Sequence, residues 1–129
     1  MYIGKGVLNW DRKERISDRY GTVFLFFDEW CDKYCRFLDK SINNQHGKLT
    51  AKVIKTRKSM HIGDLVRGFF PSTPKVGQKF TLGEGKVFFV GDAVGLVPDD
   101  VRDSDWLNPK VLYKLHHQTV ELYFEKKEG

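Results

Sequence analysis

The sequence predicts an α+β fold built on a strongly bent antiparallel sheet or a small β-barrel. One amphipathic helix is expected at about residues 28–43 and a short helix near 109–117. Short β-branched and aromatic segments alternate with closely spaced glycines and prolines, a pattern typical of antiparallel strands. One segment instead carries apolar residues at helical spacing. The length of 129 residues, 40% of them hydrophobic, suits a single domain covering residues 1–129.

The first two elements are a strand and the longer helix. The run GTVFLFF at residues 21–27 is continuous and apolar, which predicts a strand buried on both faces. Between Trp30 and Ile42, apolar side chains recur at spacings of three and four, which predicts a single apolar stripe on a helix. Asp28 is its expected N-cap, and Asn44 lies where the helix should end.

A strand is expected at residues 48–56, where apolar and polar residues alternate. The alternation directs Leu49, Ala51 and Val53 inward. It slips at Ile54, which indicates a bulge or a twist at that residue.

Further strands are expected where apolar segments lie between turn-forming residues. Residues 65–70, 79–82 and 86–90 fit this description, and Gly83-Glu84-Gly85 is the expected hairpin connection between the last two. Residues 119–125 alternate regularly and carry glutamates, which predicts a half-exposed strand at a sheet edge.

The short helix near 109–117 is predicted just before the final strand. Asp105 or Ser104 is its candidate cap, and Val111, Leu112 and Leu115 would be its apolar residues.

Composition excludes several classes of protein. The sequence has no apolar run long enough to span a bilayer, and its first fifteen residues lack the features of a signal peptide. Only two cysteines are present, Cys31 and Cys35, so a disulfide-stapled secreted scaffold is excluded. Their spacing of four could place two thiolates on one metal, and His46 follows shortly after the predicted helix. A second ligand pair is missing unless His116 and His117 fold back, so we expect core packing and no metal. We therefore expect a cytoplasmic protein that does not associate with a membrane.

The strongest functional signal is a cluster of cations on and after the strand at 48–56. The net charge is +5, and residues 1–60 carry 13 basic against 7 acidic side chains. Such charge suits a phosphate backbone, which predicts contact with RNA or single-stranded DNA. The alternative is a solvated edge strand whose lysines prevent edge-to-edge pairing. The candidate nucleic-acid-binding residues are Lys48, Lys52, Lys55, Arg57 and Lys58.

A second candidate site is the proline- and glycine-rich connection at residues 67–74. Loops held on a rigid sheet often bind partners, so Arg67, Phe69, Phe70 and Pro71 are candidate contacts to a protein. The alternative is that this loop closes one end of the core.

Catalytic material is sparse. The acid–base candidates are His61 and Asp64, together with His116 and His117, and no nucleophile lies in a recognisable setting. The acidic stretch at 98–105 lacks the glycine and glutamate of a calcium loop. We therefore expect a small non-enzymatic binding module without a cofactor, which contacts RNA or single-stranded DNA through its basic strand. The alternative is a protein-interaction module, such as an accessory, immunity or phage-type inhibitor protein, that uses the 67–74 loop.

Overall fold

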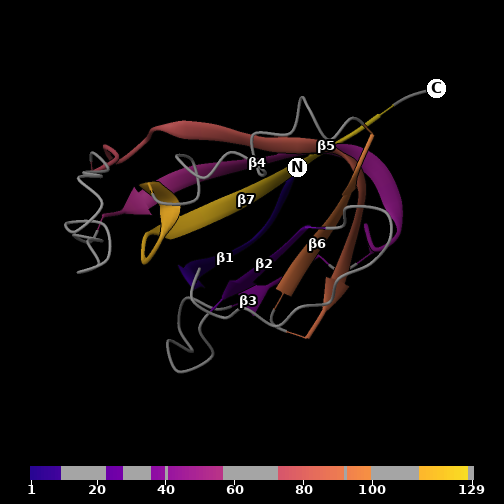
Figure 1. Cartoon of the computed structure of the whole chain (residues 1–129), viewed down its shortest axis with the longest axis horizontal. Coiled ribbons are helices and arrows are strands. Elements are labelled where there is room, and N and C mark those ends of the chain that lie inside the picture. Colours follow the sequence, from indigo (N-terminus) through magenta and orange to yellow (C-terminus); the bar gives the residue numbers. More distant parts are fainter. Residues whose placement is uncertain are drawn as a thin grey trace, which may run out of the picture.

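The computed structural model describes residues 1–9, 23–27, 36–39, 41–56, 73–91, 93–99 and 114–127. Within these ranges the chain forms one antiparallel sheet (Figure 1). Its strands are β1 (Tyr2–Asn9), β2 (Val23–Phe27), β3 (Arg36–Phe37), β4 (Gln45–Lys55), β5 (Lys79–Val90), β6 (Ala93–Pro98) and β7 (Thr119–Lys126).

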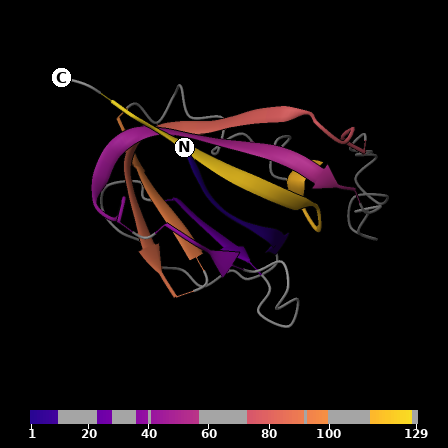
Figure 2. The same ribbon diagram turned by 180° about the vertical axis from the view of Figure 1, so that it is seen from behind.

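The strand order is β2-β6-β5-β4-β7-β1-β3, and β2 also pairs with β1. At this second pairing Leu8 lies opposite Phe27, while β3 pairs with the other half of β1 through Gly4 and Phe37. Following the pairings from β2 through β6, β5, β4, β7 and β1 therefore leads back to β2. Figures 1 and 2 show the result: β5, β4 and β7 run side by side, and the sheet curves so that β6 and β2 lie on its other side.

The core lies on the inner face of this curved sheet. As predicted, Leu49, Ala51 and Val53 of β4 are all fully buried. β7 contributes its alternate residues, and β2 is buried on both faces as expected, since Leu25, Phe26 and Phe27 are all buried. The other large, fully buried apolar side chains are Ile3, Leu8, Ile42, Leu82, Leu96, Leu115, Leu122 and Phe124.

The predicted irregularity at Ile54 is confirmed. The pairing of β4 with β7 passes from Val53 opposite Val120 to Lys55 opposite Thr119, so Ile54 is the extra residue of a bulge. The loss of alternation in the sequence therefore marked a real change in backbone register.

The predicted helix at 28–43 is wrong wherever the structure describes it. Arg36 and Phe37 form a strand, Leu38 is 59% exposed, and residues 41–44 form a turn in which Asn44 has φ 66°. Tertiary pairing has overridden the helical pattern, because β3 lies directly against β1. Gly4 allows this approach: a Cβ there would lie 2.6 Å from the Cα of Phe37. Residues 28–35, with both cysteines, lie outside the described part.

The short helix predicted near 109–117 is also corrected. Of that segment the structure describes only residues 114–117: Lys114 and Leu115 are helical, and His116 and His117, the latter at φ 60°, form the turn that leads into β7. Residues 109–113 lie outside the described part. All the secondary-structure elements formed by the described residues are strands, so the fold is nearly all β rather than α+β. In particular, none of the described residues belongs to a helix long and apolar enough to cross a membrane.

Two strand predictions also need correction. Gly83-Glu84-Gly85 is not a hairpin connection, because β5 runs unbroken through it, with an extra residue at Leu82 that shifts the register against β4. β7 is not an edge strand, since it pairs with β4 on one side and β1 on the other. The charges that suggested an edge instead lie on the outer face of a central strand.

Candidate functional site

The outer face of β4 carries the cations that the sequence singled out. Because Leu49 and Ala51 point into the core, Lys48, Thr50 and Lys52 lie on the opposite face, as the alternation predicted. β4 is flanked by β5 and β7, so these side chains lie in the middle of the sheet and not on an edge strand. The interpretation of the lysines as edge protection is therefore wrong for Lys48 and Lys52.

Strand register aligns a row of charges across this face. Lys52 lies opposite Glu121 of β7 on one side and opposite Lys79 of β5 on the other, and Glu121 in turn lies opposite Lys5 of β1. Two like charges at directly paired positions repel each other. Within the described ranges, neither Lys52 nor Lys79 forms an ion pair. These two lysines therefore lie directly opposite each other on neighbouring strands without a paired carboxylate.

The neighbouring row of outward-facing side chains on this face is polar and aromatic. Tyr2 and Tyr123 are paired across β1 and β7, and Thr50 lies between Tyr123 and Thr81. The two tyrosine rings are 5.7 Å apart between centroids. The Tyr123 hydroxyl donates a hydrogen bond of 2.5 Å to Glu121.

The same glutamate acts on the acidity of both phenols. The hydrogen bond to Glu121, with a smaller effect of burial, raises the pKa of Tyr123 above its ordinary value. Burial raises the pKa of Tyr2, and the negative charge of Glu121 adds to the effect. Glu121 therefore links the charged row to the aromatic row.

These two rows surround a surface hollow of about 530 Å³ that is open to solvent. We call it the lysine hollow. It is lined by Met1, Lys48, Thr50, Lys52, Lys79, Thr81, Tyr123, Phe124 and Glu125. Three lysines, two threonines and one tyrosine thus line one concave surface that has a single glutamate.

Beyond Lys48 the face changes character. Lys48 lies opposite Glu84 on β5 and opposite Glu125 on β7, so its row is acidic at both ends. A second hollow, of about 570 Å³, lies here and is lined also by Lys126 and Lys127. Its charges alternate in sign.

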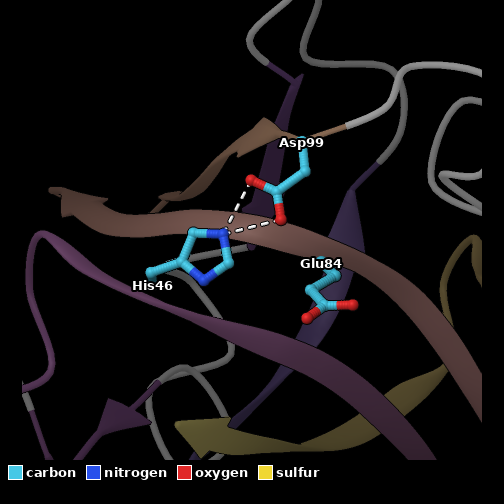
Figure 3. A group of neighbouring side chains, drawn as sticks. All are labelled: His46, Glu84 and Asp99. Carbon is cyan, nitrogen blue, oxygen red and sulfur yellow. Dashed lines mark hydrogen bonds and ion pairs between the residues drawn. The ribbon is translucent and has the colours of Figure 1, made fainter. Parts of the chain in front are cut away.

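Next to this second hollow is a histidine–carboxylate cluster of His46, Glu84 and Asp99, shown in Figure 3. His46 Nε2 lies 2.7 Å and 2.6 Å from the two carboxylate oxygens of Asp99. Lys127 Nζ lies 3.5 Å from Glu84 and 3.8 Å from Asp99. The Lys127 ammonium group therefore lies near both carboxylates, and the His46 ring lies against one of them, Asp99.

The structure places only part of the predicted sites. Lys48 and Lys52 both line the lysine hollow, whereas Lys55 is exposed at the end of β4, beyond the bulge. Arg57 and Lys58 lie outside the described residues, as do the candidate partner contacts Arg67, Phe69, Phe70 and Pro71.

Among the acid–base candidates, His61 and Asp64 also lie outside the described residues. His116 is buried and His117 half-buried, and their rings stack with centroids 3.8 Å apart.

Sequence reasoning missed Lys79, Tyr123 and the cluster around His46. The sequence contains all of these residues, but no local spacing connects them. They meet only because β5 and β7 flank β4 and because β5 contains a bulge that sets which of its residues lie opposite Lys48 and Lys52.

Comparison with known proteins adds no relative: no family model, no curated protein and no solved structure matches the chain.

Proposed function

We propose that the lysine hollow binds single-stranded nucleic acid through its phosphates. The observation that carries the proposal is the Lys52–Lys79 pair, two like charges at directly opposed positions on neighbouring strands. Such a pair opposes sheet formation in the free protein, and an anion between the two ammonium groups would attract both and offset their repulsion. A phosphate diester is an anion of suitable size and charge.

The spacing of the cations supports an extended polyanion rather than one small anion. Lys48 and Lys52 are four residues apart on β4, which corresponds to roughly 13 Å along a strand. This distance spans more than one nucleotide of an extended backbone. Thr50 lies between the two lysines, and its hydroxyl could donate a hydrogen bond to the phosphate that the lysines do not reach.

The aromatic row supports a single strand rather than a duplex. Tyr123 lines the hollow, and its ring belongs to a tilted pair with Tyr2. An unpaired base can stack on such a ring, whereas the bases of a duplex are already stacked on one another. The combination of lysines with a tyrosine on a curved sheet is typical of surfaces that bind single strands with little sequence preference.

The test is fluorescence anisotropy with labelled single-stranded RNA and DNA at about 50 mM and about 200 mM salt. We expect the affinity to fall steeply with salt. Lys52→Gln and Lys79→Gln should each weaken binding several-fold and flatten the log–log salt dependence by about 0.7 for each phosphate that the variant no longer neutralises. Lys86→Gln is the matched control, because it removes the same charge from the outer face of β5 outside the hollow.

Thermal or urea unfolding of the same variants supplies an independent readout. Lys79→Gln should leave the free protein as stable as the wild type or slightly more stable, by about 0.2–1 kcal/mol, because it removes the cross-strand repulsion. Loss of binding without loss of stability would assign the lysine to the ligand. The proposal is overturned if neither nucleic acid binds at the lower salt, or if Lys86→Gln weakens binding as much as Lys79→Gln.

A further inference from the structure

The histidine–carboxylate cluster has the donor set of a metal site. It brings together one imidazole nitrogen and two carboxylates, and the nearest donor atoms of His46, Glu84 and Asp99 all lie within 4.8 Å of one another (Figure 3). Imidazole nitrogen suits zinc, cobalt, nickel and copper, whereas calcium and magnesium favour sites made entirely of oxygen. We propose that this cluster binds a divalent transition-metal ion of the zinc class.

The three ligands come from different parts of the sheet, and the backbone holds them together. His46 is on β4, Glu84 on β5, and Asp99 directly follows β6. The Asp99 amide donates a hydrogen bond of 2.9 Å to the Glu84 carbonyl, and the Lys127 amide donates one of 3.1 Å to the His46 carbonyl. The Cα positions are therefore fixed by strand pairing, and only side-chain rotations are needed to bring the donors to one ion.

The rotations required are small. Donors bonded to one zinc ion at about 2.0–2.2 Å lie roughly 3.3 Å from each other in tetrahedral geometry. The present separation of 2.6 Å between His46 Nε2 and Asp99 must therefore increase. The most distant pair of donors lies within 4.8 Å and must close by no more than about 1.5 Å. The His46 and Asp99 side chains are 39% and 45% exposed, so the surrounding protein leaves room for these rotations once their mutual hydrogen bonds are exchanged for bonds to the metal. Three protein ligands leave the remaining positions to water.

Lys127 supplies both support for the proposal and a way to test it. Its ammonium group approaches both carboxylates, at 3.5 Å and 3.8 Å, which shows that this position attracts a cation. A metal ion bound by the same carboxylates would lie beside that positive charge and would be repelled by it. Lys127 is therefore a competitor of the metal and not one of its ligands.

The experiment is titration of the whole chain with Co²⁺ and Zn²⁺, followed by visible absorption for cobalt, by calorimetry for zinc, and by amide NMR shifts. We expect saturable binding that shifts the amide signals of residues 46, 84 and 99. His46→Gln and Asp99→Asn should each weaken binding at least about tenfold. Lys127→Met should strengthen it several-fold, because the competing charge is gone.

The direction of the Lys127 effect separates a metal site from a network that only supports the fold. In such a network Lys127→Met would lower stability and leave metal affinity unchanged. His61→Gln is the control for metal held by another histidine. The proposal is overturned if His46→Gln binds as tightly as the wild type, if the shifted amides lie elsewhere, or if Lys127→Met fails to strengthen binding. It does not depend on nucleic-acid binding, which the lysine hollow is expected to retain in His46→Gln.

Discussion

At the scale of single residues, Glu121 has several neighbours that depend on its charge. It lies between Lys5 and Lys52 in the strand register, and its carboxylate accepts the hydrogen bond of the Tyr123 hydroxyl. That hydrogen bond requires the phenol to keep its proton, which is the main reason for the raised pKa of Tyr123. The glutamate thus moderates the positive row and orients the ring that we propose as a stacking surface.

A raised phenol pKa predicts how stability depends on pH. The folded-state pKa of Tyr123 exceeds the unfolded value of about 10, so the phenol contributes stability that is complete below pH 10 and is lost as the pH rises through the folded-state pKa. In Glu121→Gln we expect the Tyr123 pKa to fall, and stability to decline less steeply above about pH 10 than in the wild type.

NMR titration of the tyrosine ring carbons would measure the Tyr123 pKa directly, and urea unfolding at about pH 8 and pH 10.5 would measure the linkage. Tyr2→Phe is the control, because Tyr2 shares the same glutamate but its replacement leaves the Tyr123 hydrogen bond in place. An unchanged Tyr123 pKa in Glu121→Gln would contradict the assignment.

At the scale of secondary-structure elements, the sequence predicted those strands whose pattern is local. The alternation in β4 predicted which face each lysine occupies and where the bulge lies, because both depend only on neighbouring side chains. The predicted helix failed because β3 gains its backbone partner from β1, which is distant in sequence. Apolar residues spaced three and four apart indicate a local helical pattern, but they carry no information about which distant strand the segment pairs with.

The same limit explains what was missed in the site. Lys48 and Lys52 could be predicted from β4 alone, but the position of Lys79 depends on which strand flanks β4 and on the bulge at Leu82. His46, Glu84 and Asp99 are up to 53 positions apart in the chain, so no motif spacing connects His46 with Asp99.

Gly85 of β5 allows two strands to approach closely and does not form the hairpin turn that we predicted. At Gly85 a Cβ would lie 2.8 Å from Pro98 Cα and equally close to the Val97 carbonyl carbon. Both atoms belong to the backbone of β6, which cannot rotate away as a side chain would. Gly85 is therefore required because β5 and β6 approach each other closely.

We expect Gly85→Ala to lower the free energy of unfolding by about 1–3 kcal/mol, because the added methyl group forces the two strands apart. Lys86→Ala, at the next position of the same strand, is exposed and should change stability by less than about 0.5 kcal/mol. Urea denaturation of both variants tests the prediction, and equal stabilities would show that the strands can separate without cost.

At the scale of the whole molecule, the sheet combines a closed set of pairings with an asymmetric outer face. The lysine hollow lies over β5, β4 and β7, while the histidine–carboxylate cluster lies where β4, β5 and the end of β6 meet. Both sites depend on β4 and β5 remaining paired. We expect their geometry to depend also on the closure of the sheet on the opposite side, where β1 meets β2.

Phe27 is the residue through which that closure can be tested. It is fully buried and lies opposite Leu8 across the β1–β2 pairing. Its ring meets the Phe37 ring of β3 edge-on, with the two ring centroids 5.2 Å apart. Gly6 accommodates it, since a Cβ there would lie 2.6 Å from the Phe27 ring. Replacing the ring with a smaller apolar side chain should loosen the packing of β1, β2 and β3 together.

Native-state hydrogen exchange on Phe27→Leu would show whether the curved sheet unfolds as one unit. If the closed pairings are cooperative, the slowest-exchanging amides of β4 and β7 should lose the same free energy of protection as those of β1 and β2. Each loss of about 1.4 kcal/mol corresponds to an exchange rate about ten times faster. Val90→Ala, at an exposed position of β5, should leave protection unchanged. Loss confined to β1, β2 and β3 would instead show that these strands open separately. The histidine–carboxylate cluster and the three lysines of the lysine hollow, which lie on β4, β5 and the end of β6, would then keep their positions in molecules whose β1, β2 and β3 have opened.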